Sequence, residues 1–363
     1  MQPPYVEMVQ RSKYNHIELS FLYIYKDYAL ATDKLLNQID CSNPMKAWKI
    51  LCTAKNLCQY ATRKQKFPLW IVFKLTYTCN SKCIYCSHRN QEQTELDLES
   101  VRKVIDKISK DCAILSLSGG EPTLREDLPE IIRYIKRKSI FLILSTNGTN
   151  LPMIRKVVPY INCLNVSLDG PREVHNRHSN IDSYDKAIES IKLARSYNKK
   201  TVINYVLTRY NHDQAENTLQ IARELDCGII FMDLVSSEHS TNCATLEPDE
   251  KRSFWKKVEI LKSRFPKIIY NSTASIKIAS GEMIPTGPCK SGKLHFFIDP
   301  KGNIFACKMD PSNGRSLLTE EKLQTILESV DHLDCRKNNC LGALNRHRDL
   351  KPYIRLTKEI LSR

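Results

Sequence analysis

Hydrophobic and polar positions form two kinds of block along the middle of the chain. Short apolar runs, such as residues 69–75 ("LWIVFKL") and 113–118 ("AILSLS"), alternate with longer stretches in which apolar residues recur every three or four positions. The short runs predict buried strands, and the longer periodic stretches predict amphipathic helices. We therefore expect six strands, at residues 69–75, 113–118, 140–146, 163–168, 201–208 and 228–234.

Five of these strands are followed by a predicted helix, at residues 98–109, 125–138, 151–158, 183–198 and 212–225. Strands that alternate with helices in this way predict parallel βαβ units. A closed barrel of such units has eight strands, so six predict an open, partial (β/α)6 TIM-like barrel of the α/β class. Functional residues in such sheets gather at the carboxyl ends of the strands.

The regions on either side of this alternation differ in pattern. We expect a helical N-terminal extension at residues 1–66, the barrel core at 67–235, a linker and helix at 236–286, and a small C-terminal region with a final helix at 287–363. The extension is expected to pack on the core, or alternatively to lie on a membrane surface or a partner as a basic helix. Residues Asp299 to Gly302 predict a hairpin turn within the C-terminal region.

Composition and charge narrow the class of protein. No apolar run approaches the roughly 20 residues of a membrane-spanning helix, and the start lacks the pattern of a signal peptide, so we expect a cytoplasmic location. The net charge is +15, but the basic residues are spread along the chain without an arginine-rich tract. This spread predicts a solvated, lysine-rich surface and does not favour a nucleic-acid partner.

Fourteen cysteines in a chain without a secretory signal favour metal or redox chemistry over disulfides. Seven of them fall into two groups, Cys79, Cys83 and Cys86, and Cys289, Cys307, Cys335 and Cys340. We expect the other seven to pack as small apolar residues: Cys41, Cys52, Cys58, Cys112, Cys163, Cys227 and Cys243.

The first cysteine group has the spacing C-x3-C-x2-C and follows the first predicted strand, with Tyr85 before the last cysteine. A structural zinc site usually has four ligands, and the nearest further candidate is His88. An iron–sulfur cubane held by three cysteines keeps one iron open for another ligand. The residues alone leave both metals open.

Polar or glycine residues stand where the next strands end. The second strand ends in "GGEP", in which the glycines permit close approach of another backbone segment. The arginine after the fourth strand is suited to binding a carboxylate through its bidentate fork. The fifth strand ends in "VLTRYN", which offers Val206 or Leu207 as an apolar contact and Asn211 as a polar one.

The cysteine motif and these strand ends, in this order, resemble the radical SAM superfamily over residues 68–234. The resemblance implies a 4Fe-4S cluster on Cys79, Cys83 and Cys86, whose open iron is chelated by S-adenosyl-L-methionine. It also implies that the "GGE" motif receives the methionine amino group. The contacts it implies for S-adenosylmethionine are Gly119, Gly120, Glu121, Pro122, Ser145, Asn147, Ser167, Asp169, Arg177 and Leu207.

The second cysteine group resembles the SPASM and twitch extensions of the same superfamily, in which a cysteine and a spacer precede G-x4-C. Here Cys289, Gly302 and Cys307 form that pattern. A full SPASM extension has seven cysteines, so four imply a twitch form or a reduced SPASM with one auxiliary 4Fe-4S cluster. Zinc is the alternative metal, and the C-x4-C spacing of Cys335 and Cys340 is wider than the usual C-x2-C.

The resemblance implies an enzyme that takes an electron from a donor such as ferredoxin or flavodoxin and cleaves S-adenosylmethionine reductively. The resulting 5′-deoxyadenosyl radical abstracts a substrate hydrogen, and the auxiliary cluster aids an oxidation or a cross-link. We expect a peptide or protein substrate, with a lipid or small metabolite as the alternative. The competing class is a non-catalytic zinc protein that binds nucleic acid.

Overall fold

The computed structural model describes residues 68–86, 94–234, 244–284, 291–307 and 313–330. The chain divides into two compact units, residues 1–65 with 353–363, and residues 66–352, and the described residues all belong to the second unit. The helical extension predicted at residues 1–66 and the predicted final helix lie outside the described residues.

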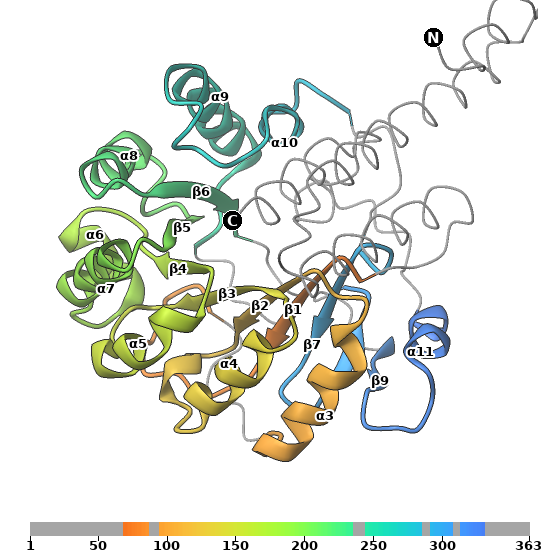
Figure 1. Cartoon of the computed structure of the whole chain (residues 1–363). Coiled ribbons are helices and arrows are strands. Elements are labelled where there is room, and N and C mark those ends of the chain that lie inside the picture. Colours follow the sequence, from red (N-terminus) through yellow and green to blue (C-terminus); the bar gives the residue numbers. More distant parts are fainter. Residues whose placement is uncertain (1–67, 87–93, 235–243, 285–290, 308–312, 331–363) are drawn as a thin grey trace, which may run out of the picture. The chain divides into compact units, whose positions relative to one another are not determined.

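The described strands form one nine-stranded sheet in the order β6-β5-β4-β3-β2-β1-β7-β8-β9 (Figure 1). Strands β1 to β7 pair in parallel, and β8 and β9 are antiparallel. The six predicted strands are confirmed, as β1 (Trp70–Lys74), β2 (Ile114–Ser118), β3 (Phe141–Thr146), β4 (Cys163–Ser167), β5 (Lys200–Leu207) and β6 (Gly228–Asp233).

The predicted helices between the strands are also confirmed. They are α3 (Leu98–Ser109), α4 (Leu128–Lys136), α5 (Leu151–Val157), α7 (Tyr184–Ser196) and α8 (Ala215–Glu224). Figure 1 shows these helices along one side of the sheet. The start of α3 has a clear local signal, because the Asp97 side chain accepts a hydrogen bond from Ser100 N and so caps the helix.

The structure adds helical elements that the pattern did not predict. A 3-10 turn, η1 (Pro122–Leu124), follows β2, and η2 (Val158–Tyr160) precedes β4. Helix α6 (Arg172–Ser179) lies between β4 and α7. After β6 come the expected helix α9 (Pro248–Arg264) and the additional helices α10 (Thr273–Ala279) and α11 (Leu323–Ser329).

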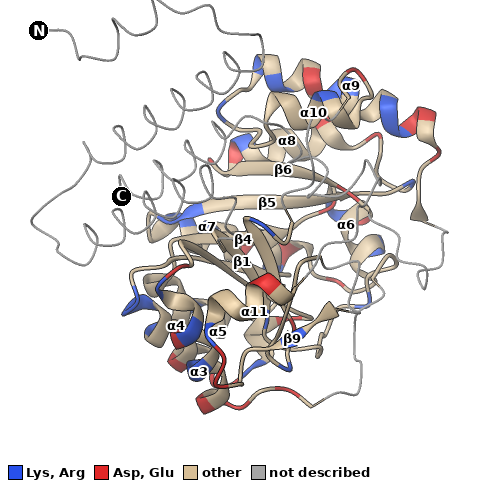
Figure 2. Ribbon diagram, turned by 90° about the vertical axis from the view of Figure 1, so that its right-hand side faces the viewer, with Lys and Arg blue, Asp and Glu red and all other residues tan. Residues whose placement is uncertain are grey.

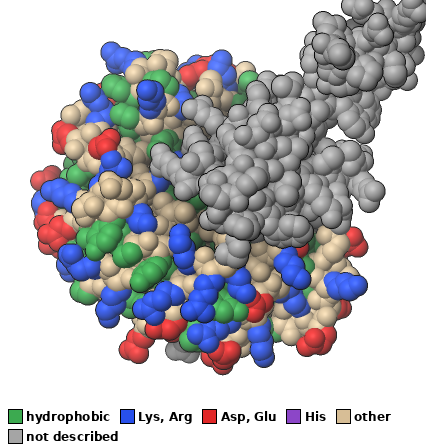
Figure 3. Space-filling model, in the orientation of Figure 1, with side chains coloured by type: hydrophobic (Ala, Val, Ile, Leu, Met, Phe, Trp, Pro, Cys, Tyr) green, Lys and Arg blue, Asp and Glu red, His purple; other side chains and the backbone are tan. Residues whose placement is uncertain are grey.

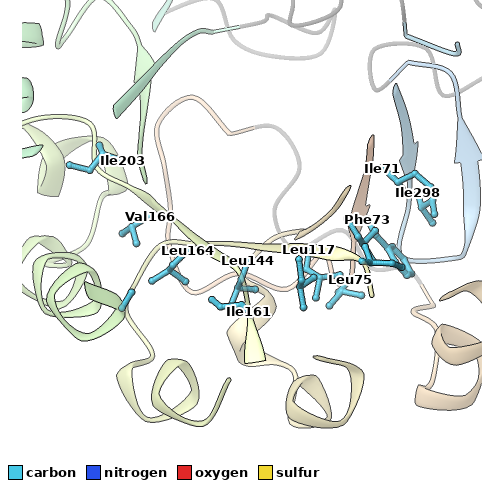
Figure 4. Packing of buried hydrophobic residues seen from close by; sticks show 14 of the residues in the cluster. Ile71, Phe73, Leu75, Leu117, Leu144, Ile161, Leu164, Val166, Ile203 and Ile298 are labelled. Atoms are coloured by element: carbon cyan, nitrogen blue, oxygen red, sulfur yellow. The ribbon is translucent and has the colours of Figure 1, made fainter. Parts of the chain in front are cut away.

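Each parallel strand has one face toward the helices and one toward the opposite, inner side of the sheet. In β1, Ile71 and Phe73 are buried in the core, whereas the alternate residues Val72 and Lys74 are partly exposed. The same alternation is present toward the carboxyl ends of β3, β4 and β5, and Figure 4 shows the core side chains lying in a row along the sheet. The hydrophobic core therefore lies between the sheet and the helices.

The hairpin predicted at Asp299 to Gly302 is confirmed. Strands β7 (His295–Ile298) and β8 (Asn303–Phe305) pair in antiparallel fashion, and Gly302 has a φ of +82°. Strand β7 also pairs in parallel with β1, so the hairpin and the short strand β9 (Arg315–Ser316) extend the barrel sheet. The hairpin is therefore continuous with the barrel sheet, a connection that the sequence pattern did not predict.

Charged side chains lie mainly on the helices, whereas the strands have few of them (Figure 2). On the face drawn in Figure 3, basic and acidic side chains are interspersed, as expected for a solvated surface. Within the described ranges, no helix is both long and apolar enough to cross a membrane. Of the cysteines expected in the core, Cys112, Cys163 and Cys227 are buried, and Cys41, Cys52, Cys58 and Cys243 lie outside the described residues.

Candidate active site

The cysteine loop, residues 75–86, follows the carboxyl end of β1. Cys79 and Cys83 are partly exposed, Cys86 is exposed, and none of the three forms a disulfide. The loop is held to the end of α6 by two backbone hydrogen bonds, from Lys82 N to Ser179 O at 2.9 Å and from Ile84 N to His178 O at 3.0 Å. The three thiols are thus carried by a segment with a defined backbone position.

The two glycines after β2 lie directly against the backbone of the cysteine loop. Gly120 N donates to Thr76 O at 2.7 Å, and Glu121 N donates to Thr78 O at 2.8 Å. A Cβ atom on Gly120 would lie 2.3 Å from Thr78 O, and one on Gly119 would lie 2.5 Å from Thr76 O. Only glycine fits at both positions, so the close backbone approach expected from the sequence is present.

Glu121 is fully buried, and its carboxylate accepts four hydrogen bonds. Thr123 donates through its backbone N and hydroxyl, at 3.0 and 2.6 Å, while Thr146 Oγ1 and Asn147 N each donate at 2.7 Å. Burial raises the pKa of Glu121, and these hydrogen bonds oppose the rise. The carboxylate therefore joins the ends of β2 and β3, and Pro122 begins η1 beside it.

Asn147, at the end of β3, also contacts the cysteine loop. Its side-chain nitrogen donates to Asn80 Oδ1 at 2.8 Å and to Ser81 Oγ at 2.9 Å. Its Oδ1 accepts from the backbone and the hydroxyl of Thr149. Asn147 is therefore engaged in positioning the loop, whereas the nearby Ser145 side chain is partly exposed on the inner side of β3.

Asp169 is the buried junction between the cysteine loop and the ends of β4 and β5. Its Oδ2 accepts from the Tyr85 hydroxyl at 2.9 Å, and its Oδ1 accepts from Val206 N at 2.9 Å. His178 Nδ1 lies 3.7 Å from Oδ2, is fully buried and has no hydrogen-bond partner among the residues that the structure describes. Burial, together with the Asp169 charge, raises the pKa of Tyr85 well above its usual value.

The thiol of Cys83 lies in a desolvated, electronegative setting. Burial is the main cause that raises the pKa of this thiol, and the charge of Asp169 and the thiolates of Cys86 and Cys79 act in the same direction, so that the pKa is about 12. Within the described ranges no His, Cys, Asp or Glu trio is arranged to hold a single metal ion.

The remaining predicted contacts are spread over the ends of β4 and β5. Ser167 is partly exposed on the inner side, and the exposed Arg177 places its guanidinium 5.1 Å from the centre of the Tyr210 ring. Leu207 is only 3% exposed and packs in the hydrophobic core, so Val206 is the apolar residue that faces the inner side.

Asn211 is buried and fully engaged. Its amide nitrogen donates to Asp169 O at 3.0 Å and to Val206 O at 2.9 Å, and its Oδ1 accepts from Thr208 N at 2.8 Å. It therefore supports the ends of β4 and β5 from behind rather than offering a polar group to a ligand.

The structure identifies positioning residues that the sequence did not indicate. Glu95 Oε1 accepts from Thr76 Oγ1 and Tyr77 N, each at 2.7 Å. Arg125 donates to the carbonyls of Leu75 and Leu96, each at 3.0 Å, while pairing with Asp127. These contacts fix the start of the cysteine loop, and no local sequence signal marks them because each joins separate segments.

The second cysteine group is described only in part. Cys307 follows β8 and is partly exposed, whereas Cys289, Cys335 and Cys340 lie outside the described residues. Because β8 runs antiparallel to β7 and β1, Cys307 lies toward the amino end of β1, and the cysteine loop lies beyond its carboxyl end. The five residues of β1 separate these ends by about 13 Å.

Known proteins with similar sequences agree with the resemblance that the cysteine motif indicated. The model of the radical SAM superfamily matches residues 73–222. The Fe-coproporphyrin III synthase of Methanosarcina barkeri is 30% identical over 156 residues, which cover 41% of this chain and 39% of the relative. The mycofactocin maturase MftC of Mycobacterium tuberculosis is 26% identical over 254 residues, which cover 66% of this chain and 64% of the relative.

A solved structure shares the fold. Streptococcus suis SuiB, in a crystal structure with its precursor peptide SuiA, has a TM-score of 0.65 and 16% identity, covering 86% of this chain and 78% of the SuiB chain. The fold likeness agrees with the predicted partial barrel. The chain spans less than two thirds of the length of the two curated relatives named above.

Proposed function

Residues 73–222 match the model of the radical SAM superfamily, and we propose on this premise that the chain is an enzyme that binds a 4Fe-4S cluster and S-adenosyl-L-methionine. Cys79, Cys83 and Cys86 would hold the cluster. The observation that carries the proposal is the cysteine loop itself, which follows β1 and is fixed by the "GGE" segment after β2 and by Asp169 after β4.

The residues present fit this cluster. A desolvated thiolate at Cys83, surrounded by other negative charges, is unfavourable until a cationic metal compensates for it. Each thiolate in a cubane binds a different iron, so the three sulfurs spread further apart than the ligands of one ion. Three thiols on one fixed loop suit that donor set.

The cluster and S-adenosylmethionine, when bound, supply a 5′-deoxyadenosyl radical that abstracts a substrate hydrogen. The backbone of Gly119 and Gly120 and the side chains of Ser145, Ser167 and Arg177 would bind S-adenosylmethionine, and Val206 would contact it through its apolar side chain. Glu121 would hold the ends of β2 and β3 in place. We also propose that the "GGE" segment that contains Glu121 receives the methionine amino group.

We also propose that the second cysteine group, Cys289, Cys307, Cys335 and Cys340, holds an auxiliary 4Fe-4S cluster. The hairpin before Cys307 supports this proposal, because it joins the barrel sheet through β1. A centre held by Cys307 would lie toward the amino end of β1, whereas the cysteine loop follows the carboxyl end. A centre separate from the cysteine loop suits electron transfer to or from a substrate.

The proposed substrate is a peptide or protein. Support comes from the maturase among the relatives and from the fold shared with a protein solved with its precursor peptide. The Fe-coproporphyrin III synthase favours the alternative of a small metabolite, since its name indicates a tetrapyrrole. An electron donor such as ferredoxin or flavodoxin is required for either substrate, and a cytoplasmic location is proposed with it.

Anaerobic reconstitution followed by spectroscopy tests the proposed cofactors. If both clusters are present, the protein should be brown and contain about eight irons per chain, four from each cluster. Addition of S-adenosylmethionine should change the electron paramagnetic resonance signal of the reduced cluster on Cys79, Cys83 and Cys86. Colourless protein that contains zinc and binds nucleic acid in a salt-dependent way would instead support the non-catalytic class.

A further inference from the structure

Four polar side chains face the inner side of the barrel sheet on three adjacent strands. They are Ser145 on β3, Asn165 and Ser167 on β4, and Asn204 on β5, here called the polar quartet. Their neighbours in sequence point the other way, because Leu164, Val166 and Ile203 pack in the helix-facing core. Each member of the polar quartet is partly exposed.

The strand register brings the four side chains together. Ser145 pairs with Asn165 across β3 and β4, and Ser167 pairs with Asn204 across β4 and β5. Paired residues on neighbouring strands lie about 4.8 Å apart. Asn165 pairs with Val202, so Asn204 is its diagonal neighbour and lies within reach of one small ligand group.

The hydrogen-bonding groups of the polar quartet are largely uncommitted among the described residues. The contact recorded for Asn165 is that its Oδ1 accepts from Cys163 Sγ at 3.4 Å, which leaves its amide nitrogen as a donor. Within the described part of the chain, the side chains of Ser145, Ser167 and Asn204 form no hydrogen bond. Two amides and two hydroxyls on one sheet face therefore offer both donors and acceptors without a formal charge.

Apolar side chains lie next to this polar surface on β6 and farther along the sheet on β1 and β7. Asn204 pairs with Ile230 on β6, where Met232 also faces inward, and both are partly exposed. On the other side, Phe297 of β7 pairs with Val72 of β1, and both are partly exposed. Between them, the row of the polar quartet continues through Ser118 and Lys74.

We propose that Asn165 and Asn204, the two amides of the polar quartet, are the specificity-determining residues of a substrate-recognition site for the backbone amide groups of a peptide, beside the Ser145 and Ser167 hydroxyls that we assign to S-adenosylmethionine. A side-chain amide presents one donor and one acceptor in a plane, which matches the N–H and C=O of a peptide group. The apolar borders on β6 and β7 then accommodate the peptide's side chains. That this site binds the substrate rests on the proposed function. Binding of a peptide to Asn165 and Asn204 can nevertheless be measured without radical chemistry.

The two asparagines of the polar quartet distinguish a ligand that contains amide groups from a lipid or an oxyanion. A lipid chain would leave the amides unpaired in the interface, which is unfavourable. An oxyanion would be bound by the cationic Lys74 rather than by Asn204, which lies on a strand four places along the sheet from β1. The two asparagines therefore predict dependence on an amide group in the ligand.

The test is anaerobic equilibrium dialysis of the full, cluster-loaded chain with N-acetyl-alanyl-alanine amide, an uncharged probe made of peptide groups. Asn165→Leu and Asn204→Leu keep approximate shape and remove the hydrogen bonds. Each should weaken probe binding by roughly three- to tenfold. Asn217→Leu, at an exposed position on α8, is the matched control and should leave binding unchanged.

Acetate and glycerol serve as competing probes for an oxyanion or a polyol site. The proposal is overturned if the wild-type chain binds either of them and not the peptide probe, or binds none of the three. It is also overturned if both leucine variants bind the peptide probe as the wild type does. If Asn204→Leu melts at a lower temperature than the wild type, Asn204→Asp replaces it, because aspartate keeps the shape and the acceptor of asparagine. Loss of 5′-deoxyadenosine formation alone would count against the proposed function, not against this site.

Discussion

The hydroxyl of Tyr85 donates a 2.9 Å hydrogen bond to Asp169 Oδ2 and thereby ties the cysteine loop to the end of β4. The two residues are 84 positions apart in sequence. Asp169 also accepts from Val206 N on β5, so one buried carboxylate fixes three segments at the site. Asp169 is therefore best described as a positioning residue for the loop.

Tyr85→Phe should loosen the cysteine loop and speed the loss of iron. A hydrogen bond to a charged group contributes about 1.5–3 kcal/mol, which corresponds to about a tenfold or larger change in the rate of iron release to a chelator. Tyr134→Phe is the matched control, because Tyr134 donates at 2.7 Å to Asp106 on the exposed surface. Equal release rates for the two variants would contradict the positioning role.

Asp169→Asn separates charge from hydrogen bonding at the same position. Removing a negative charge near Cys83 stabilises the more negative, reduced cluster, so the reduction potential should rise. Tyr85→Phe retains that charge and should not raise the potential. A spectroelectrochemical titration of both variants checks this difference, and an unchanged potential in Asp169→Asn would contradict the electrostatic role.

Gly120→Ala should disrupt the contact between the end of β2 and the cysteine loop. The added Cβ would lie 2.3 Å from a backbone oxygen that cannot move independently, so the free energy of unfolding should fall by about 2–3 kcal/mol. Gly281→Ala is a milder control, at about 1 kcal/mol, because its Cβ meets only the flexible Arg252 side chain in a left-handed turn. Urea unfolding of the metal-free chain compares them.

Asp233 should make the stability of the metal-free chain depend on pH. Burial raises its pKa, while Lys251 Nζ at 2.9 Å and Trp255 Nε1 at 2.8 Å oppose the rise. The folded state therefore binds this proton more tightly than the unfolded state, so stability falls as the pH rises from the usual value of 3.8 through the raised one.

Asp233→Asn removes that titration. Its free energy of unfolding, relative to the wild type, should increase as the pH rises from acidic to neutral. Urea unfolding at several pH values measures the difference. A difference that decreases with rising pH would show that the ion pair with Lys251 outweighs the burial of the carboxylate.

Iron content separates the two proposed clusters. Cys83→Ala should reduce iron from about eight to about four per chain and abolish the response of the spectrum to S-adenosylmethionine. Cys307→Ala should lower iron by a similar amount while retaining that response. Cys227→Ala, at a buried core position, should leave both unchanged. Full iron in Cys307→Ala would contradict the auxiliary cluster.

Much of the barrel could be predicted from sequence because its signals are local. Each strand from β1 to β6 is a short apolar run, and each cysteine or glycine motif stands at a strand end. Pairing of β7 with β1 was not predictable, because the two strands are more than 200 residues apart and no local signal specifies the partner.

The side-chain roles were less accessible than the strands. The carboxyl end of strand β5 is apolar on both faces, so its sequence did not reveal that Leu207 faces the core and Val206 the inner side. Likewise, the sequence identified Glu121 and Asp169 as polar strand-end residues. Their burial and their contacts with Asn147 and Tyr85 depend on how distant segments pack.

The central claim is that Cys79, Cys83 and Cys86 hold a cluster that activates S-adenosylmethionine. The most direct test is the amount of 5′-deoxyadenosine formed when the anaerobically reconstituted chain is reduced with dithionite in the presence of S-adenosylmethionine. We predict its formation by the wild type and by Cys227→Ala, and its absence with Cys83→Ala. No 5′-deoxyadenosine from the iron-loaded wild type, or its undiminished formation by Cys83→Ala, would contradict the claim.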